Sequence, residues 1–250
     1  VWVVDWNFNT SSGANRTLVN SGVSSISNNA NGYKFGNLII DITNSSINDW
    51  TLTGGPYYYN LCENDLTITY NSSNTLYGVS NASSGVGFYV KGNMTVNGTG
   101  PFSFGGTFGN GIFNQKIDID GNFSYTGSST LKTHTIVTGT LNGLTSNINI
   151  KGNFTVGSTC TGFSGDKSTG TTPNQVSKLN LNGSGTVQLL SVYPTAVAVP
   201  ITVKAGASVK LSDYNLTLNS LSSVTADFTV EGTATFDFNW NSSNTPLIIT

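Results

Sequence analysis

Residues 119–129, IDGNFSYTGSS, carry a phrase that occurs three times in this chain. The other copies are VKGNMTVNG at 90–98 and IKGNFTVGS at 150–158. Each copy places an apolar residue, a charged residue and a Gly-Asn pair before a run in which apolar and hydroxyl residues alternate. The glycines of the three copies are Gly92, Gly121 and Gly152, and Gly183 follows at the same nearly constant spacing. A repeat of about 20 to 50 residues is typical of a solenoid, in which each repeat forms one coil.

Weaker copies extend the repeat in both directions. Gly36 and Asn64 precede the first strong copy at almost the same spacing, and Gly206 and Gly232 follow the last copy at a shorter one. We therefore expect about eight coils of 23–31 residues along the chain.

The coils should consist of β-strands. In TADFTVE at 225–231 polar and apolar residues alternate strictly, which indicates a strand with one wet face. Amphipathic helical patterns are nearly absent, so we predict an all-β fold and a single elongated β-solenoid domain over 1–250.

An antiparallel β-sandwich is the alternative fold. In a sandwich, four Asn-Gly or Asp-Gly pairs would form type I′ hairpin turns. These pairs are Asn97-Gly98, Asp120-Gly121, Asn142-Gly143 and Asn182-Gly183. We favour the solenoid, because a sandwich gives no reason for a nearly constant period.

Phrases such as LNLNGSGTVQLLS at 179–191 and FTVEGTATFDFN at 228–239 give the chain a family resemblance. Over about residues 85–240 it resembles the glycine- and asparagine-rich parallel β-helix repeats of secreted surface proteins. The resemblance implies a secreted, extracellular β-solenoid.

Composition narrows the class of protein. Of the 250 residues 37% are hydrophobic, which suffices for a core, but only 9% are charged and the net charge is −2. Because no block of Lys or Arg exists to bind phosphates, nucleic acid is not an expected partner. The uncharged stretch 188–203 is interrupted by Pro194 and Pro200, so we expect buried strands there and no membrane span.

Asn-x-Ser/Thr acceptor sites for N-glycosylation are frequent. They lie at Asn9, Asn15, Asn44, Asn71, Asn81, Asn93, Asn97, Asn122, Asn153, Asn182, Asn215 and Asn241. Asn93, Asn122 and Asn153 occupy the same place in the repeated phrase, which predicts a shared outward-facing position. Covalent glycans would supply the hydration that charged residues do not, although Asn is also common in turns without glycans.

Two further features fit a place outside the cell. We expect a disulfide between Cys62 and Cys160, with two free buried thiols as the alternative. The opening VWVVDWNF has no basic region and no small-residue cleavage site, so we expect a processed form of a secreted protein.

Candidate catalytic groups are few. His134 is the single histidine, and alternation predicts an exposed side chain without catalytic partners. Asp118 and Asp120 share a strand face and could bind Ca²⁺ or act with Lys116 on an acidic sugar. The other copies of the phrase replace Asp120 by Lys91 and Lys151, so we expect a solubilising face, no enzyme activity, no metal and no cofactor.

The first strand suggests assembly. Alternation puts Trp2, Val4, Trp6 and Phe8 on one face of a strand over 1–9, where they either complete the core or add to a neighbouring subunit. In this it resembles subunits of the donor-strand threads and pili on archaeal and bacterial surfaces. The C-terminal NTPLIIT at 244–250 could play the same part.

The leading functional hypothesis is a structural subunit of an extracellular, N-glycosylated filament or surface appendage. Such a homopolymer would assemble head-to-tail through β-strand contacts. The alternative is a secreted carbohydrate-binding or polysaccharide-cleaving β-helix protein. An ice-binding or adhesive solenoid would need flat ranks of Thr, and Thr67/Thr69 and Thr133/Thr135 are isolated pairs in the sequence.

Overall fold

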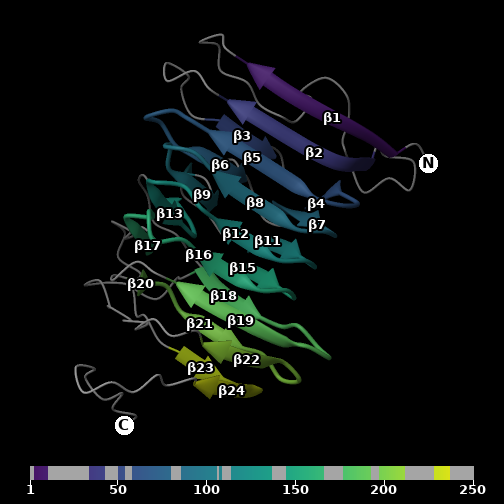
Figure 1. Cartoon of the computed structure of the whole chain (residues 1–250). Helices are drawn as coiled ribbons and strands as arrows, with labels where there is room; N and C mark the ends of the chain where they lie inside the picture. The colour runs from purple at the N-terminus through teal and green to yellow at the C-terminus, as the bar shows by residue number, and fades with distance from the viewer. Residues whose placement is uncertain are drawn as a thin grey trace.

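A computed structural model describes residues 3–10, 34–42, 50–53, 58–79, 86–105, 107–108, 114–136, 145–165, 177–192, 197–211 and 228–236. Every regular element in these ranges is a β-strand, which confirms the predicted all-β fold. Figure 1 shows the strands stacked into a rod, with β1 (Val3–Thr10) at one end and β24 (Thr233–Phe236) at the other. No helix in the described ranges is long and apolar enough to cross a membrane.

The strands form three sides of a coil. The first side contains β4 (Tyr58–Cys62), β7 (Val86–Val90), β11 (Asn114–Ile119), β15 (Thr145–Ile150), β18 (Ser177–Leu181), β21 (Ile201–Val203) and β23 (Phe228–Val230). The second side contains β5 (Leu66–Tyr70), β8 (Met94–Asn97), β12 (Phe123–Tyr125), β16 (Phe154–Val156), β19 (Val187–Val192), β22 (Ser208–Leu211) and β24 (Thr233–Phe236). Near the N-terminus β2 (Lys34–Ile42) pairs with both β4 and β5, so it belongs to both sides.

The third side is shorter. It consists of β3 (Trp50–Thr53), β6 (Leu76–Val79), β9 (Phe102–Gly105), β13 (Thr130–Lys132), β17 (Gly162–Ser164) and β20 (Val197–Ala198). Beside it β10 (Thr107–Phe108) pairs with β14 (Thr135–Ile136), and β1 (Val3–Thr10) pairs with β2 at the N-terminal end. Strands β19, β20 and β21 occupy the stretch that the sequence assigned to buried strands.

Each pairing between described strands is parallel, which is the arrangement of a solenoid. The sandwich alternative is therefore not supported. Asp120-Gly121 is a corner between β11 and β12 and not a hairpin turn. The described glycines with positive φ are Gly98, Gly185 and Gly206.

Gly121 is needed at its corner because the neighbouring coil approaches closely. A Cβ atom on Gly121 would lie 2.5 Å from the carbonyl oxygen of Gly92, and one on Gly152 would lie 2.5 Å from that of Gly121. The same glycines donate their N–H groups to the preceding corner, at 3.0 Å in both cases. The corner phrase of the sequence thus encodes a backbone-to-backbone stack.

The predicted count of about eight coils is wrong for the regular part of the stack. Corner bonds of this kind join Gly36, Asn64, Gly92, Gly121 and Gly152, which amounts to about four turns. At Gly183 the pattern changes, because its N–H group donates to the side chain of Gln188. Beyond that point the spacing also shortens, so the strands continue the sides of the coil without the regular corner.

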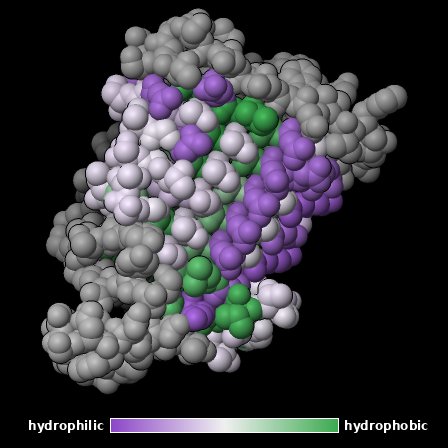
Figure 2. Space-filling model, in the orientation of Figure 1, coloured by the Kyte–Doolittle hydropathy of each residue, from purple (hydrophilic) through white to green (hydrophobic). Residues whose placement is uncertain are grey.

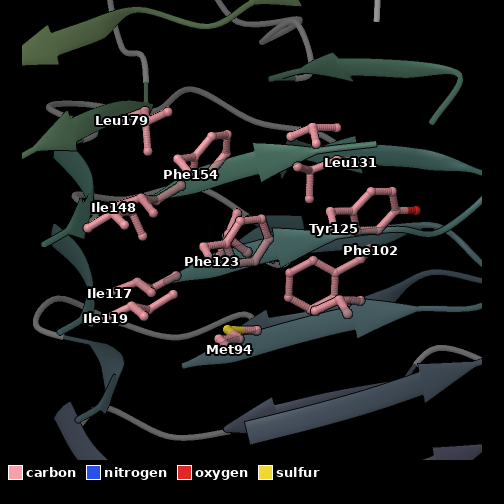
Figure 3. Close-up of a cluster of buried hydrophobic side chains, with 14 of the residues drawn as sticks. Met94, Phe102, Ile117, Ile119, Phe123, Tyr125, Leu131, Ile148, Phe154 and Leu179 are labelled. Atoms are coloured by element: carbon pink, nitrogen blue, oxygen red, sulfur yellow. The ribbon is translucent and has the colours of Figure 1, made fainter. Parts of the chain in front are cut away.

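The interior is filled by columns of apolar side chains. On the first side Phe88, Ile117, Ile148, Leu179 and Ile201 follow one another in register and are all fully buried. Figure 3 shows side chains of the first side, among them Ile148, and of the second side filling the same interior. Phe123 and Phe154 belong to neighbouring coils of the second side. The rings of these two residues are stacked, with centroids 5.0 Å apart. Consecutive coils therefore share one continuous core.

Candidate functional site

A row of charged residues runs along the corner between the first and second sides. Its members directly follow the last inward residue of six of the seven first-side strands, and they are Glu63, Lys91, Asp120, Lys151, Lys204 and Glu231. After β18 the uncharged Asn182 takes this place. The amino group of Lys151 lies 2.6 Å from Asp120, that of Lys204 lies 2.6 Å from Glu231, and Lys91 pairs with Glu63. Hydrophilic surface forms a band along this edge of the molecule in Figure 2.

The sequence interpretation missed this pairing. It treated the exchange of Asp120 for Lys91 and Lys151 as the loss of a ligand. In the stack these residues are neighbours, so the change of sign from copy to copy gives ion pairs between coils. Alternation of charge at one place of the repeat was the available signal. Exposed ion pairs of this kind contribute about 0 to 1 kcal/mol each to the free energy of unfolding. The row therefore matters more for the register of the coils and for solubility than for stability.

A second polar row lies on the outer face of the first side. Asn149 Nδ2 donates to Asp118 Oδ1 at 2.7 Å, Asn180 Nδ2 donates to Asn149 Oδ1 at 2.9 Å, and Lys116 lies 2.9 Å from Asp118. The Tyr89 hydroxyl donates to Asp120. Burial, together with this bond, raises the pKa of Tyr89 to about 12.

The sequence predicted that Asp118 and Asp120 share a strand face. Asp118 lies on the outer face of β11 and Asp120 at the corner that follows it, and both carboxylates are engaged by amide, hydroxyl or ammonium groups. Within the described ranges no group of three or more His, Cys, Asp or Glu side chains is placed to hold a metal ion.

An asparagine ladder follows the corner at the start of the second side. Asn93 Oδ1 accepts the backbone N–H of Asn122 at 2.9 Å, and Asn122 Oδ1 accepts that of Asn153 at 2.8 Å. Asp65 takes the same place one coil earlier and accepts the N–H of Asn93 at 2.7 Å. Asn153 completes the ladder by accepting from Leu189 at 2.8 Å. Each rung satisfies a corner N–H group of the next coil.

The predicted glycosylation sites fall into three groups: three sites of the ladder, four other sites in the described residues, and five sites outside them. The shared position of Asn93, Asn122 and Asn153 is confirmed, since they form three rungs of the ladder, with Asn93 and Asn122 exposed and Asn153 half-buried. Asn71 and Asn97 are half-buried, Asn9 lies in β1, and Asn182 has a buried Oδ1 atom without a partner in the described residues. The other predicted sites, Asn15, Asn44, Asn81, Asn215 and Asn241, lie outside the described residues.

The predicted disulfide is not formed. Cys62 and Cys160 are free and buried, and Cys62 stands in register between Phe35 and Val90 on the first side. Cys160 belongs to the coil of Gly152, three corners later, so at about 4.8 Å per coil the sulfurs are too distant to bond. Burial raises the pKa of Cys62 to about 12 and also raises the pKa of Cys160.

The prediction of an exposed His134 is also wrong. Its side chain is fully buried, and Nδ1 lies 3.1 Å from the hydroxyl of Thr133. The chain turns inward after β13, so the alternation of a straight strand does not hold there.

The predicted assembly strand pairs within its own chain. Strand β1 runs parallel to β2, with Trp6 in register with Leu38 and Phe8 with Ile40, and it has an irregularity between Val4 and Trp6. Trp2 and the segment 244–250 lie outside the described residues. In this arrangement β1 is the outermost rung of the N-terminal end.

Comparison with known proteins gives no relative: no family model, curated protein or solved structure matches this chain.

Proposed function

We propose that this chain is a structural subunit of an extracellular filament or surface appendage. In this proposal it is a homopolymer, N-glycosylated at surface sequons, in which copies join head-to-tail through β-strand contacts. Two features support a structural part over a chemical one: the polar rows connect coils to one another, and their carboxylates are engaged by neighbouring side chains.

The proposal rests mainly on the exposure of the Val230 side chain. This residue continues an inward column of the first side that contains Val90, Ile119, Ile150, Leu181 and Val203 in register. The earlier members of the column are fully buried, whereas Val230 is 45% exposed. The apolar column therefore ends open at the C-terminal end of the stack.

The N-terminal end continues the same register. Val4 of β1 is in register with Phe35, which occupies the same register position as this column. Because all strands run in the same direction, one end of a copy can continue the sheet of the next. Such a contact joins two different surfaces and does not close on itself, so it produces a filament.

A pair of lysine substitutions on β23 tests the proposal. Val230→Lys places an ammonium group on the end of the column and should keep the full-length chain monomeric, because a buried unpaired charge opposes docking. Thr229→Lys adds the same charge to the exposed outer face of the strand and should polymerise like the unmodified chain. Sedimentation velocity and electron microscopy at high concentration distinguish monomer from filament.

Two results would overturn the proposal. One is an unmodified chain, with β1 intact, that stays monomeric at every concentration reached. The other is a Val230→Lys variant that forms filaments as readily as the Thr229→Lys control.

Carbohydrate binding is the second candidate function. It is favoured by the gathering of Tyr89, Lys116, Asp118 and Asn149 on one outer face, where a tyrosine ring and amide groups could contact a sugar. A thermal shift with any of a panel of polysaccharides, lost in Tyr89→Ala, would support this function. The paired state of the carboxylates supports binding rather than cleavage.

A further inference from the structure

The outer face of the second side carries a two-column array of hydroxyl groups. In the first column Thr67, Thr95, Ser124 and Thr155 follow one another in register on β5, β8, β12 and β16. In the second column Thr69 and Asn97 are in register, and Thr126 continues the column through the bond of its N–H to Val96 O at 2.9 Å. The sequence shows only the pairs Thr67/Thr69 and Ser124/Thr126, because the other neighbours lie on successive coils and are one full repeat apart along the chain.

The fold does not use these hydroxyl groups. None of the six Thr and Ser side chains of the array makes a hydrogen bond within the described part of the chain. Other hydroxyl groups of the protein do so: Ser103 donates to Gly105 O at 2.6 Å, and Thr159 donates to Gly127 O at 3.1 Å. The donors and acceptors of the array are therefore left for solvent.

The array is also uncharged. Strands β5, β8, β12 and β16 contain no Asp, Glu, Lys or Arg, while the charged row lies along the adjacent corner. In Figure 2 the surface next to the hydrophilic band is pale, which corresponds to residues of intermediate hydropathy. The nearest charge in register is that of Asp41 on β2, which borders the array next to Thr69. Within the array itself no ion has a hydration shell that would disturb an ordered layer of water.

The spacings of the array fit ordered water. Stacked coils lie about 4.8 Å apart, and alternate residues of a strand about 6.7 Å apart. Tetrahedral water with O···O distances of about 2.75 Å has second-neighbour oxygens about 4.5 Å apart and a repeat of about 7.3 Å along its stacking direction. Both spacings agree within about a tenth. Threonine suits such a lattice because its β-branched side chain holds few rotamers.

We propose that this face binds ice, with the hydroxyl columns anchoring an ordered layer of water that joins the crystal lattice. The ligand is a crystal surface, so affinity comes from many weak, regularly spaced contacts and not from a pocket. This activity does not depend on filament formation.

The test uses the full-length chain produced without N-glycans, because Thr95 and Ser124 complete the acceptor sites of Asn93 and Asn122. It measures how this chain partitions between liquid and slowly growing ice. The unmodified chain should be enriched in the ice. The Thr95→Tyr and Ser124→Tyr variants should be excluded from the ice, as ordinary soluble proteins are. A tyrosine ring in the middle of the array would prevent the ice lattice from contacting the hydroxyl groups. Lys178→Tyr, an equally large change at an exposed position on the first side, should partition like the unmodified chain. Circular dichroism of each variant confirms the fold.

Two additions separate this proposal from others. Ser124→Thr completes the first column and should increase the enrichment in ice. Repeating the measurement on monomeric Val230→Lys keeps the result independent of assembly. Exclusion of the unmodified chain from ice would overturn the proposal. Binding of the chain to an insoluble polysaccharide would not rescue it in that case. Equal enrichment of the tyrosine variants and the unmodified chain would overturn it as well.

Discussion

Gln188 supplies the hydrogen bonds at the corner of Gly183, where the stack of corner glycines is interrupted. Its Oε1 accepts the N–H of Gly183 at 2.7 Å, and its Nε2 donates to the carbonyl oxygen of Gly152 at 2.6 Å. The side-chain amide thus replaces the direct bond that joins Gly121 to Gly152 in the regular corner. Its side chain is 1% exposed, so solvent cannot take over these bonds.

We predict that Gln188→Leu lowers the free energy of unfolding by about 2 to 6 kcal/mol, since two backbone groups lose their partner at about 1 to 3 kcal/mol each. Urea denaturation measures the change. Gln188→Glu keeps the acceptor for Gly183 but turns a buried carboxylate toward the carbonyl oxygens of Gly152 and Ile150, so it should destabilise at least as much as Gln188→Leu. Equal stability of Gln188→Leu and the unmodified chain would show that the amide is not needed at the corner.

Cys62 gives the stability an alkaline pH dependence. Its pKa is raised from 9.0 to about 12, so the folded thiol stays protonated while the thiol of the unfolded chain ionises above pH 9. The contribution is fully present below pH 9 and is lost as the pH rises toward 12, by up to about 4 kcal/mol.

Urea midpoints measured from pH 8 to 11 should fall for the unmodified chain and fall less steeply for Cys62→Ala. Some dependence should remain, because burial also raises the pKa of Tyr125. Parallel pH profiles for the two proteins would exclude the thiol as the cause. The same burial predicts that thiol reagents label Cys62 and Cys160 only after unfolding.

The asparagine ladder stabilises the second side through hydrogen bonds between coils. Asn122→Ala removes the acceptor of the Asn153 N–H group and should cost about 1 kcal/mol in urea denaturation. Ser124→Ala destroys the same acceptor site for glycosylation but leaves the ladder intact, and its hydroxyl makes no hydrogen bond in the described residues, so it should change stability little. In a glycosylating host, equal losses for both variants would assign the stability to a glycan at Asn122 instead.

The corner shows what the sequence could and could not predict about such elements. The period, the place of Gly121 and the outward position of Asn122 follow from the repeated phrase. The hydrogen bonds of the ladder and the ion pairs of the charged row do not, because each joins residues about one coil apart and depends on the register of the stack. The burial of His134 could not be predicted from the sequence either, since it depends on where the third side of the coil ends.

The three-sided cross-section could not be predicted from the sequence, whereas the parallel stack of coils could. Its strands are only three to six residues long in the regular coils, and their alternation fixes which residues face inward but not where the chain turns. The count of coils failed for a related reason. A glycine in the repeat marks a corner, but only close packing against the next corner makes that corner regular, and Gly183 lacks this contact with Gly152.

If one coil is the unit of this fold, removing one whole coil should preserve it. Deletion of residues 122–152 joins Gly121 to Asn153, so that Phe154 takes the place of Phe123 above Met94 and Asn153 takes that of Asn122 above Asn93. We expect a β-rich chain that unfolds cooperatively in urea, with a lower free energy of unfolding because one interface between coils is lost. Deletion of 122–136, about half a coil, should abolish cooperative unfolding, because every later strand loses its register with the strand before it. If both deletions unfolded alike, the stability would have to come from contacts that are specific to each coil, and not from a stack of equivalent units.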